Sequence, residues 1–159
     1  MATTDPRTPA LDALDGLLRL SSYPHHVLSY VDTDGYPVNV AVAAEVNADD
    51  RIARFVPPAG LAVPADGTVS LTGSHIRPQP GYGYDERRHV TVWGSVATEA
   101  DGRLALHAAS AWGWDEAETP FFEYSERSVG QSRRYFDAIS AERGTPVRPR
   151  LSFGWLALR

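Results

Sequence analysis

The sequence has no cysteine among its 159 residues and only one methionine. Without a thiol the chain cannot form disulfides, cysteine-ligated metal sites or thiolate nucleophiles. No apolar run approaches the ~20 residues needed to cross a bilayer, and the first residues lack the charged start and apolar stretch of a secretory signal. The net charge is −5, without a run of Lys or Arg that could follow a phosphate backbone. We therefore expect a cytoplasmic protein with neither membrane nor nucleic acid as a partner.

The composition indicates an ordinary globular protein, with 43% hydrophobic and 22% charged residues. A chain of this length fits a single domain, 1–159, that buries its own core. Residues 1–7 resemble a flexible tail. Thr8 and Pro9 are typical of the start of a helix, which we place at 8–20. A capping box of Ser128 and Gln131 predicts a second helix at 128–144, which Gly144 would end.

Several β-rich runs with turn residues between them predict the rest of the chain. Asp34-Gly35 lies between the runs 26–32 and 36–42 and is a strong hairpin signal, because the turn needs positive φ. Further strands are expected at 51–56, 68–76, 87–96 and 151–158, whereas 103–112 has helical composition. This order predicts a mainly β (α+β) fold, an antiparallel barrel with accessory helices.

The run from Arg87 to Val96 alternates as a half-buried strand does. Val90, Val92 and Val96 share one face, and the other face carries an imidazole, a hydroxyl and an indole, from His89, Thr91 and Trp93. With Arg87 and Arg88 at its mouth, this strand could contact a flat, anionic ligand. Alternatively, it is a barrel strand with Trp93 at a subunit interface.

Three other features suggest binding and also have plain structural explanations. Thr72 and Ser74 share a face of the strand 68–76, where their hydroxyls could hold a phosphate or a flavin ring edge, or be solvated. Tyr82 and Tyr84 lie in a glycine-containing loop that could form a flap beside a pocket, or cover apolar surface. Arg54 could pair with an anion or extend its head group to the sheet edge.

The order of these features resembles that of the pyridoxamine 5′-phosphate oxidase-like, FMN-binding split barrels. The shared order is a hairpin with an Asp-Gly turn, a short third strand, a fourth strand with Ser and Thr, a basic loop, and a strand ending in Gly94-Ser-Val96. The resemblance covers about His26 to Gly102. It implies an antiparallel split β-barrel and a homodimer with two equivalent FMN sites at the subunit interface.

In that family the positions of His26 to Tyr30 and Arg88 to Thr91 touch the flavin ring, and His89 stands where several members place an amide side chain. Basic residues after the third strand usually hold the phosphate, whereas 57–64 here contains no Lys or Arg. Arg54, Arg77, Arg87 or Arg88 would have to replace them. The resemblance thus implies cofactor-binding residues Arg54, Thr72, Ser74, Arg87, Arg88, His89, Thr91 and Trp93, and substrate-binding residues Tyr82 and Tyr84.

Other chemistries find little support. The five histidines lack metal-ligand spacing, and no nucleophile elbow or phosphate-binding loop is present. The acidic group Asp115, Glu116 and Glu118 is typical of a solvated face. We therefore expect a flavin-type oxidoreductase that uses FMN or a deazaflavin on a small planar substrate. The alternatives are a non-catalytic split barrel that binds haem or another small ligand, and a cofactor-less dimeric interaction module.

Overall fold

The computed structural model describes residues 11–65, 67–81 and 83–147, with only the backbone described at 127, 128 and 131. The chain divides into two compact units. One lies within Pro9–Pro120 and contains the sheet and the first helix; the other contains the second helix. Each unit is described by itself.

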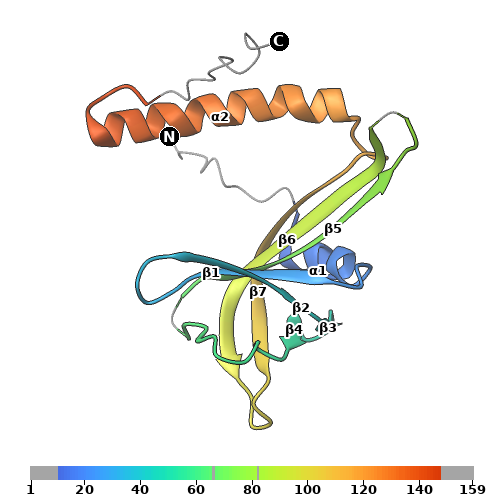
Figure 1. Ribbon diagram of the computed structural model, residues 1–159, viewed down its shortest axis with the longest axis vertical. Coiled ribbons are helices and arrows are strands. Elements are labelled where there is room, and N and C mark those ends of the chain that lie inside the picture. Colours follow the sequence, from blue (N-terminus) through green and yellow to red (C-terminus); the bar gives the residue numbers. More distant parts are fainter. Residues whose placement is uncertain (1–10, 66, 82, 148–159) are drawn as a thin grey trace. The chain divides into compact units, whose positions relative to one another are not determined.

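The first unit is built on one seven-stranded sheet (Figure 1). Its strands are β1 (His26–Val31), β2 (Pro37–Val42), β3 (Ala44–Asn47), β4 (Ile52–Phe55), β5 (Val69–Pro78), β6 (Tyr84–Thr98) and β7 (Leu104–Asp115). They lie in the order β2-β1-β5-β6-β7-β4-β3, and every neighbouring pair is antiparallel. The mainly β, antiparallel prediction is confirmed.

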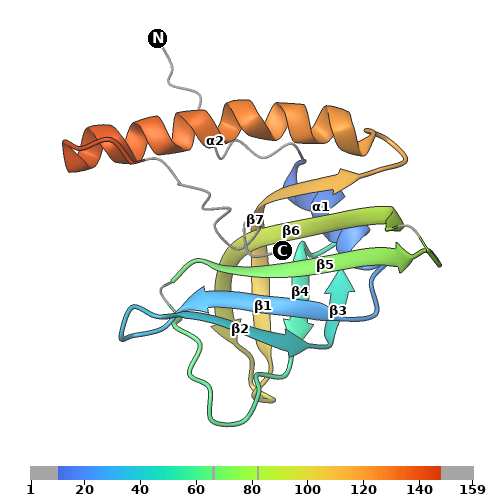
Figure 2. The same cartoon turned by 45° about the horizontal axis from the view of Figure 1, so that its top comes forward.

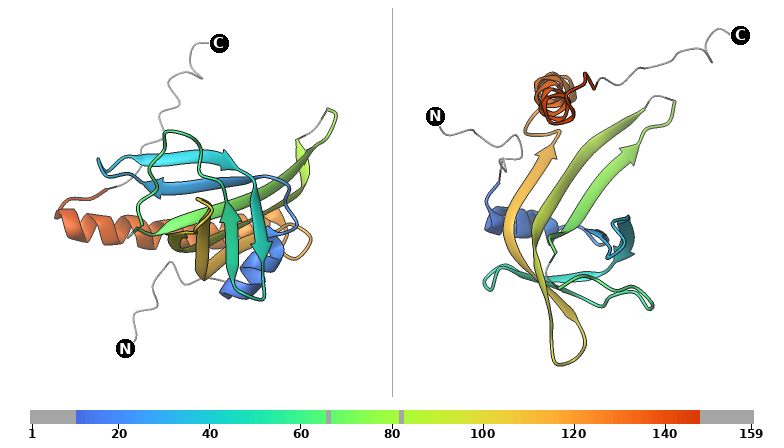
Figure 3. Two further views of the ribbon diagram at one scale, coloured as in Figure 1. Left: turned by 90° about the horizontal axis from the view of Figure 1, so that it is seen from below. Right: turned by 90° about the vertical axis from the view of Figure 1, so that its left-hand side faces the viewer.

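The sheet curls because its two edge strands are consecutive in the chain. β2 and β3 lie at opposite ends of the strand order, yet only Ala43 separates them. The two edges therefore approach each other at this residue, while β1, β5 and β6 run side by side across the sheet (Figure 2). The long strands β5, β6 and β7 bend along their length (Figure 3). A curled, incompletely closed sheet is the form expected of a split barrel.

The predicted hairpin between β1 and β2 is present. Gly35 has a φ of 87°, and Asp32 Oδ1 accepts hydrogen bonds from the backbone N–H of Asp34 at 2.9 Å and of Tyr36 at 2.8 Å. The aspartate thus closes the turn that the glycine permits.

The inner face of the sheet carries the core. The alternation predicted for β6 is confirmed, since Val90 and Val92 are fully buried and Val96 nearly so. Around them pack apolar side chains from every long strand and from the first helix: Leu17, Leu20, Leu28, Tyr30, Val42, Phe55, Val69, Leu71, Leu104, Leu106 and Ala111. This face is filled by the protein itself.

Helix α1 (Ala13–Leu20) starts later than predicted. Asp12 is its N-cap and accepts from the backbone N–H of Leu14 and Asp15; Thr8 and Pro9 lie outside the described residues. Gly16 is buried, and a Cβ at this position would lie 2.1 Å from Cβ of Ala111. The glycine therefore lets the helix pack directly on β7.

The prediction of helical structure at 103–112 was wrong, because these residues form most of β7. Leu and Ala give the segment helical propensity, but pairing with β6 and with β4 overrides it. The register shifts between Trp93 and Gly94, which pair with Ser110 and Ala108. This β-bulge accommodates the extra residue Ala109.

Helix α2 (Phe121–Arg143) begins at Phe121 rather than at Ser128, so the expected capping box falls inside the helix. It ends before Gly144, as predicted, where φ is 65°. The strand predicted at 151–158 lies outside the described residues. Within the part of the chain that the structure describes, no helix is both long and apolar enough to span a membrane.

Candidate functional site

The outer face of the sheet, opposite the core, brings the predicted polar and aromatic residues together. Thr72 of β5 pairs with Thr91 of β6, and Thr91 pairs with Trp112 of β7. Paired residues of antiparallel strands project from the same face. These three residues therefore form one row across the sheet, which Val27 of β1 extends.

Two parallel rows flank it. Ser74, His89 and Trp114 form the row toward the β5–β6 turn, and Ser70, Trp93 and Ser110 form the row on the other side. We call the residues of these three rows on β5, β6 and β7 the outer-face cluster: Ser70, Thr72, Ser74, His89, Thr91, Trp93, Ser110, Trp112 and Trp114. Of the predicted cofactor-binding residues, Thr72, Ser74, His89, Thr91 and Trp93 belong to it.

The side chains of the cluster contact one another. Oγ1 of Thr72 and Oγ1 of Thr91 lie 2.9 Å apart, within hydrogen-bond distance. The His89 ring lies near two indoles; its centroid is 4.9 Å from that of Trp112 and 6.1 Å from that of Trp114. The Trp114 indole N–H donates to the carbonyl oxygen of Thr119 at 2.8 Å, which fixes the ring. The cluster is therefore an ordered set of hydroxyls and flat rings.

The imidazole of this cluster favours its neutral form. Burial lowers the pKa of His89 below its ordinary value, because the charged form loses hydration. Near neutral pH, His89 therefore offers one N–H donor and one nitrogen acceptor. The cluster residues on β5, β6 and β7 are all uncharged in this state.

Arg87 lies beside the cluster in an ion pair with Glu116, in the turn after β7. Its Nε donates to Oε2 of Glu116 at 3.1 Å and its NH2 group to Oε1. Its backbone N–H also donates to Oε2, and the N–H of Glu116 donates to the carbonyl of Arg87. The guanidinium carbon lies 5.9 Å from the centroid of Trp114. Hydrogen bonding to Arg87 lowers the pKa of Glu116, so the pair stays charged at neutral pH.

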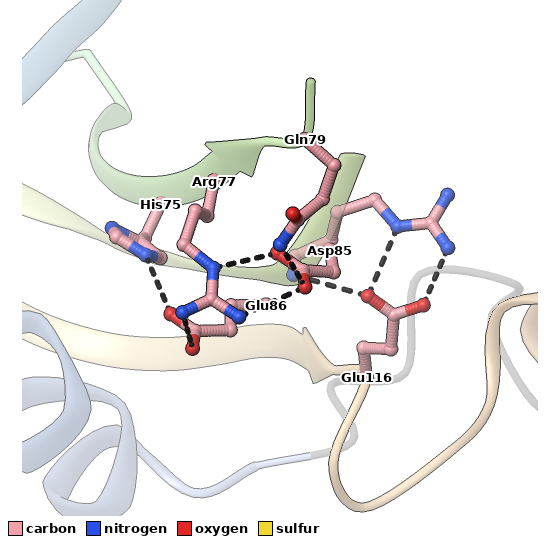
Figure 4. Close-up of polar contacts among 7 residues, drawn as sticks. His75, Arg77, Gln79, Asp85, Glu86 and Glu116 are labelled. Atoms are coloured by element: carbon pink, nitrogen blue, oxygen red, sulfur yellow. Dashed lines mark hydrogen bonds and ion pairs between the residues drawn. The ribbon is translucent and has the colours of Figure 1, made fainter. Parts of the chain in front are cut away.

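A second charged group lies at the β5–β6 turn (Figure 4). Arg77 Nε donates to Asp85 at 2.8 Å, and its NH1 lies 2.9 Å from Glu86. Gln79 donates to Asp85 as well, and His75 lies 3.4 Å from Glu86. Glu86 has a φ of 49°, where the register between β5 and β6 shifts. This end of the sheet thus carries two arginines, Arg77 and Arg87, and the carboxylates of Asp85, Glu86 and Glu116.

Arg54 is distant from the cluster. It pairs in the sheet with Ala105, which pairs with Ala97, and Ala97 is about 20 Å from Thr91 along β6 at the usual rise per residue. Its Nε donates to Glu99 at 2.8 Å, with both side chains partly buried. Of the two possibilities considered for Arg54, the structure shows pairing with an anion, and this anion is a carboxylate of the chain itself.

Arg88 lies on the inner face, with the same parity as Val90, opposite His75 and Asp115 in the register. It interacts with the hydroxyl of Tyr23, a buried residue whose pKa is raised by its burial. Tyr84 is exposed at the start of β6, and Tyr82 lies outside the described residues. The structure does not bring Arg54 or Arg88 to the outer-face cluster.

The first strand contributes only alternate residues to this face. Val27 and Ser29 lie on it, whereas His26, Leu28 and Tyr30 are buried on the inner side. His26 Nε2 lies 3.1 Å from the carbonyl of Leu20, and its Nδ1 accepts from the N–H of Ala44 at 3.3 Å. His26 therefore ties α1 to the β2–β3 corner.

Trp112, Trp114 and Glu116 were not predicted as site residues. The alternation Trp112-Gly113-Trp114 is a strand signal that would have placed both indoles on one face. This strand signal was not used, because residues 103–112 were interpreted as helical from their composition. No sequence pattern links Glu116 to Arg87, because only the β6–β7 pairing brings them together. Among the described residues, no group of three or more His, Asp or Glu could hold a metal ion.

The chain is similar to several solved structures at low sequence identity. No family model matches the sequence, and no curated protein matches it. Similar solved structures include an FAD-binding protein from Mycobacterium smegmatis (15% identity, TM-score 0.49) and a candidate pyridoxamine 5′-phosphate oxidase from Corynebacterium glutamicum (11%, 0.47). A conserved protein of unknown function from Corynebacterium diphtheriae is also similar (16%, 0.47).

Each of these similarities covers 65% of this chain and 93% of the other. At these identities and scores they add no argument about function, and the fold assignment rests on the strand order and register described above.

Proposed function

We propose that the protein is a flavin-type oxidoreductase that binds the flavin ring on the outer-face cluster of β5, β6 and β7. The observation that carries the proposal is the composition of this cluster. Hydroxyls, a neutral imidazole and indoles, all uncharged, lie on one face of adjoining strands, while the opposite face is filled by the core. A flat heteroaromatic ring with polar edges requires this combination of stacking surfaces and hydrogen-bonding groups.

The residues present fit a flavin ring. Thr72, Thr91 and Ser74 can donate to or accept from the polar edge of the ring, and the neutral His89 can do either. Trp93 and Trp112 are half-buried and present indole surface on the same face. A bound flavin would supply hydride or electron transfer, and these side chains would orient it and exclude water. Tyr84, with Tyr82, is proposed to contact the substrate.

The same proposal includes a homodimer. The outer face also carries Val27 and Val31, whose side chains are exposed in the single chain. A second copy of the chain placed on this face would cover the apolar side chains and enclose a ring bound on the cluster. FMN, the cofactor that the family resemblance implies, and a deazaflavin are the first ligands to test.

The test is a spectroscopic titration of purified protein with riboflavin, FMN and a deazaflavin. We expect quenching of ligand or tryptophan fluorescence on binding, and loss of the visible flavin absorbance when a nicotinamide nucleotide reduces the bound ring. Absence of binding by all three ligands would overturn the proposal. An absorbance band typical of haem in the purified protein would instead support the haem-binding alternative.

One observation favours a second candidate, a cofactor-less dimeric interaction module. Arg54, Arg77 and Arg87, three of the arginines considered for a phosphate, form ion pairs with carboxylates of the chain. A module of this kind would sediment as a dimer and bind none of the three ligands. The titration therefore separates the two functions.

A further inference from the structure

Arg87 is the basic residue beside the outer-face cluster, and its charge is compensated by the chain. Glu116 accepts from both the side chain and the backbone N–H of Arg87. About a quarter of each side chain is exposed, so a ligand reaching Arg87 also meets the carboxylate. The backbone N–H of Arg87 holds the same carboxylate in place, so the guanidinium can turn toward a ligand only by breaking its two side-chain hydrogen bonds to Glu116.

The surrounding charges do not restore an attraction for anions. Arg77 and Arg87 face the carboxylates of Asp85, Glu86 and Glu116, whose positions Figure 4 shows. Hydrogen bonding to Arg87 keeps the pKa of Glu116 below its ordinary value, although the nearby charge of Asp85 acts in the opposite direction, so Glu116 stays charged. On the inner face, Arg88 and Asp115 add one charge of each sign. Among the described residues, this end of the sheet thus carries an excess of negative charge.

We propose that Glu116 makes the site selective for an uncharged flavin, riboflavin or its deaza analogue, over the phosphorylated forms. This proposal rests on the proposed function, since it concerns the same site. The phosphate group of FMN carries a charge of about −1.5 to −2 at neutral pH. Near Glu116 that group would meet a like charge, whereas the ring itself needs only the uncharged cluster.

Glu116 is thus a specificity-determining residue, and the ligand class that it selects is an uncharged flavin. Glu116 does not touch the flavin ring; it acts by holding Arg87 and by repelling an anion. Removing its charge while keeping its shape should therefore change the ratio of the two affinities more than the affinity for riboflavin.

The experiment compares the dissociation constants of riboflavin and FMN by fluorescence titration of the full chain. In the unmodified protein we expect riboflavin to bind at least ~10-fold more tightly than FMN at low salt, with the ratio falling as added salt screens the repulsion. In Glu116→Gln the ratio should fall to ~3-fold or less, because FMN gains affinity. Glu118→Gln is the matched control. Glu118 lies in the same turn but pairs with Arg19, so the ratio of the FMN and riboflavin dissociation constants should be the same in this variant as in the unmodified protein.

The outcomes are distinguishable. If FMN binds as tightly as riboflavin or more tightly, or if Glu116→Gln leaves the ratio unchanged, the selectivity proposal is wrong while the flavin site stands. If neither ligand binds, the proposed function fails, and the selectivity with it. Should Glu116→Gln fail to fold, as judged by circular dichroism, the salt series on the unmodified protein still decides: a ratio that does not depend on salt overturns the proposal.

Discussion

The side chains of the outer-face cluster differ in how far the sequence alone could predict them. Alternation along β6 correctly placed His89, Thr91 and Trp93 on one face, because a strand has a period of two. The ion pairs of Arg54 with Glu99 and of Arg87 with Glu116 could not be predicted, because the two partners of each pair are distant in sequence. Long-range pairing of strands decides which charges meet, and local pattern carries no information about it.

The Thr72–Thr91 pair allows the contribution of the hydroxyls to flavin binding to be measured separately from their effect on the stability of the fold. In the double variant Thr72→Val, Thr91→Val both partners of the 2.9 Å contact become apolar with nearly the same shape. We expect the free energy of unfolding to change by less than ~1 kcal/mol, since no partner is left unsatisfied. Flavin binding should weaken by about 1–3 kcal/mol, or roughly 5- to 150-fold, through the loss of two hydrogen-bonding groups.

Fluorescence titration and urea denaturation measure the two quantities. Thr98→Val, at the exposed end of the same strand β6, is the control and should change neither. Wild-type flavin affinity in the double variant would show that these hydroxyls do not contact the ligand.

His89 gives a prediction about pH. Burial lowers its pKa in the folded chain below the ordinary 6.5. The unfolded chain therefore takes up the proton first as pH falls. The contribution of neutral His89 to stability is complete above about pH 6.5 and is lost as pH falls through the folded pKa. We expect His89→Gln to lose less stability than the wild type between about pH 7.5 and about pH 5.

Urea denaturation at the two pH values measures the effect. Carboxylates contribute to acid sensitivity in both proteins, so the comparison uses the difference between them. His107→Gln, on an exposed position of β7, should behave as the wild type. An equal loss of stability in His89→Gln and the wild type would contradict the prediction.

At the scale of elements, the hairpin β1–β2 and the strands β4, β5 and β6 were predictable, because turn residues and alternation are local signals. β7 was not predictable, because its Leu- and Ala-rich start favours a helix and only its partners β6 and β4 make it a strand. The start of α2 was predicted too late. The residues from Phe121 were interpreted as an aromatic segment, and the capping box of Ser128 and Gln131 was interpreted as the start of the helix.

The β-bulge of β6 and β7 depends on Gly94. A Cβ at this position would lie 1.9 Å from the carbonyl oxygen of His107, which belongs to the backbone of the neighbouring strand. We expect Gly94→Ala to reduce the free energy of unfolding by about 3 kcal/mol, since backbone must move to relieve the clash. Thermal or urea denaturation measures the loss.

Gly67→Ala is the matched control for this variant. Its new Cβ would lie 3.4 Å from the nearest atom, in Pro64, which is an ordinary contact, so we expect a change of less than ~1 kcal/mol. A Gly94→Ala protein as stable as this control would mean that the two strands do not approach as closely as described.

At the scale of the whole molecule, the proposed site and the proposed dimer use the same surface. We expect sedimentation to give a mass about twice the 17.4 kDa of one chain. Val27→Asp should shift the protein toward the monomer, because it places a charge on the shared outer face. Val56→Asp, an equally drastic change of an exposed valine just after β4, should leave the mass unchanged. A monomeric wild type would remove the dimer from the proposal.

NMR spectroscopy can locate a flavin ring bound on the outer face of β5, β6 and β7 directly. Riboflavin added to isotopically labelled protein should shift the NMR signals of the His89 imidazole and of the Trp112 and Trp114 indole N–H groups. The buried imidazole of His26 should be little affected. Shifts confined to His26, or to residues away from these three strands, would mean that the flavin does not bind on the outer face.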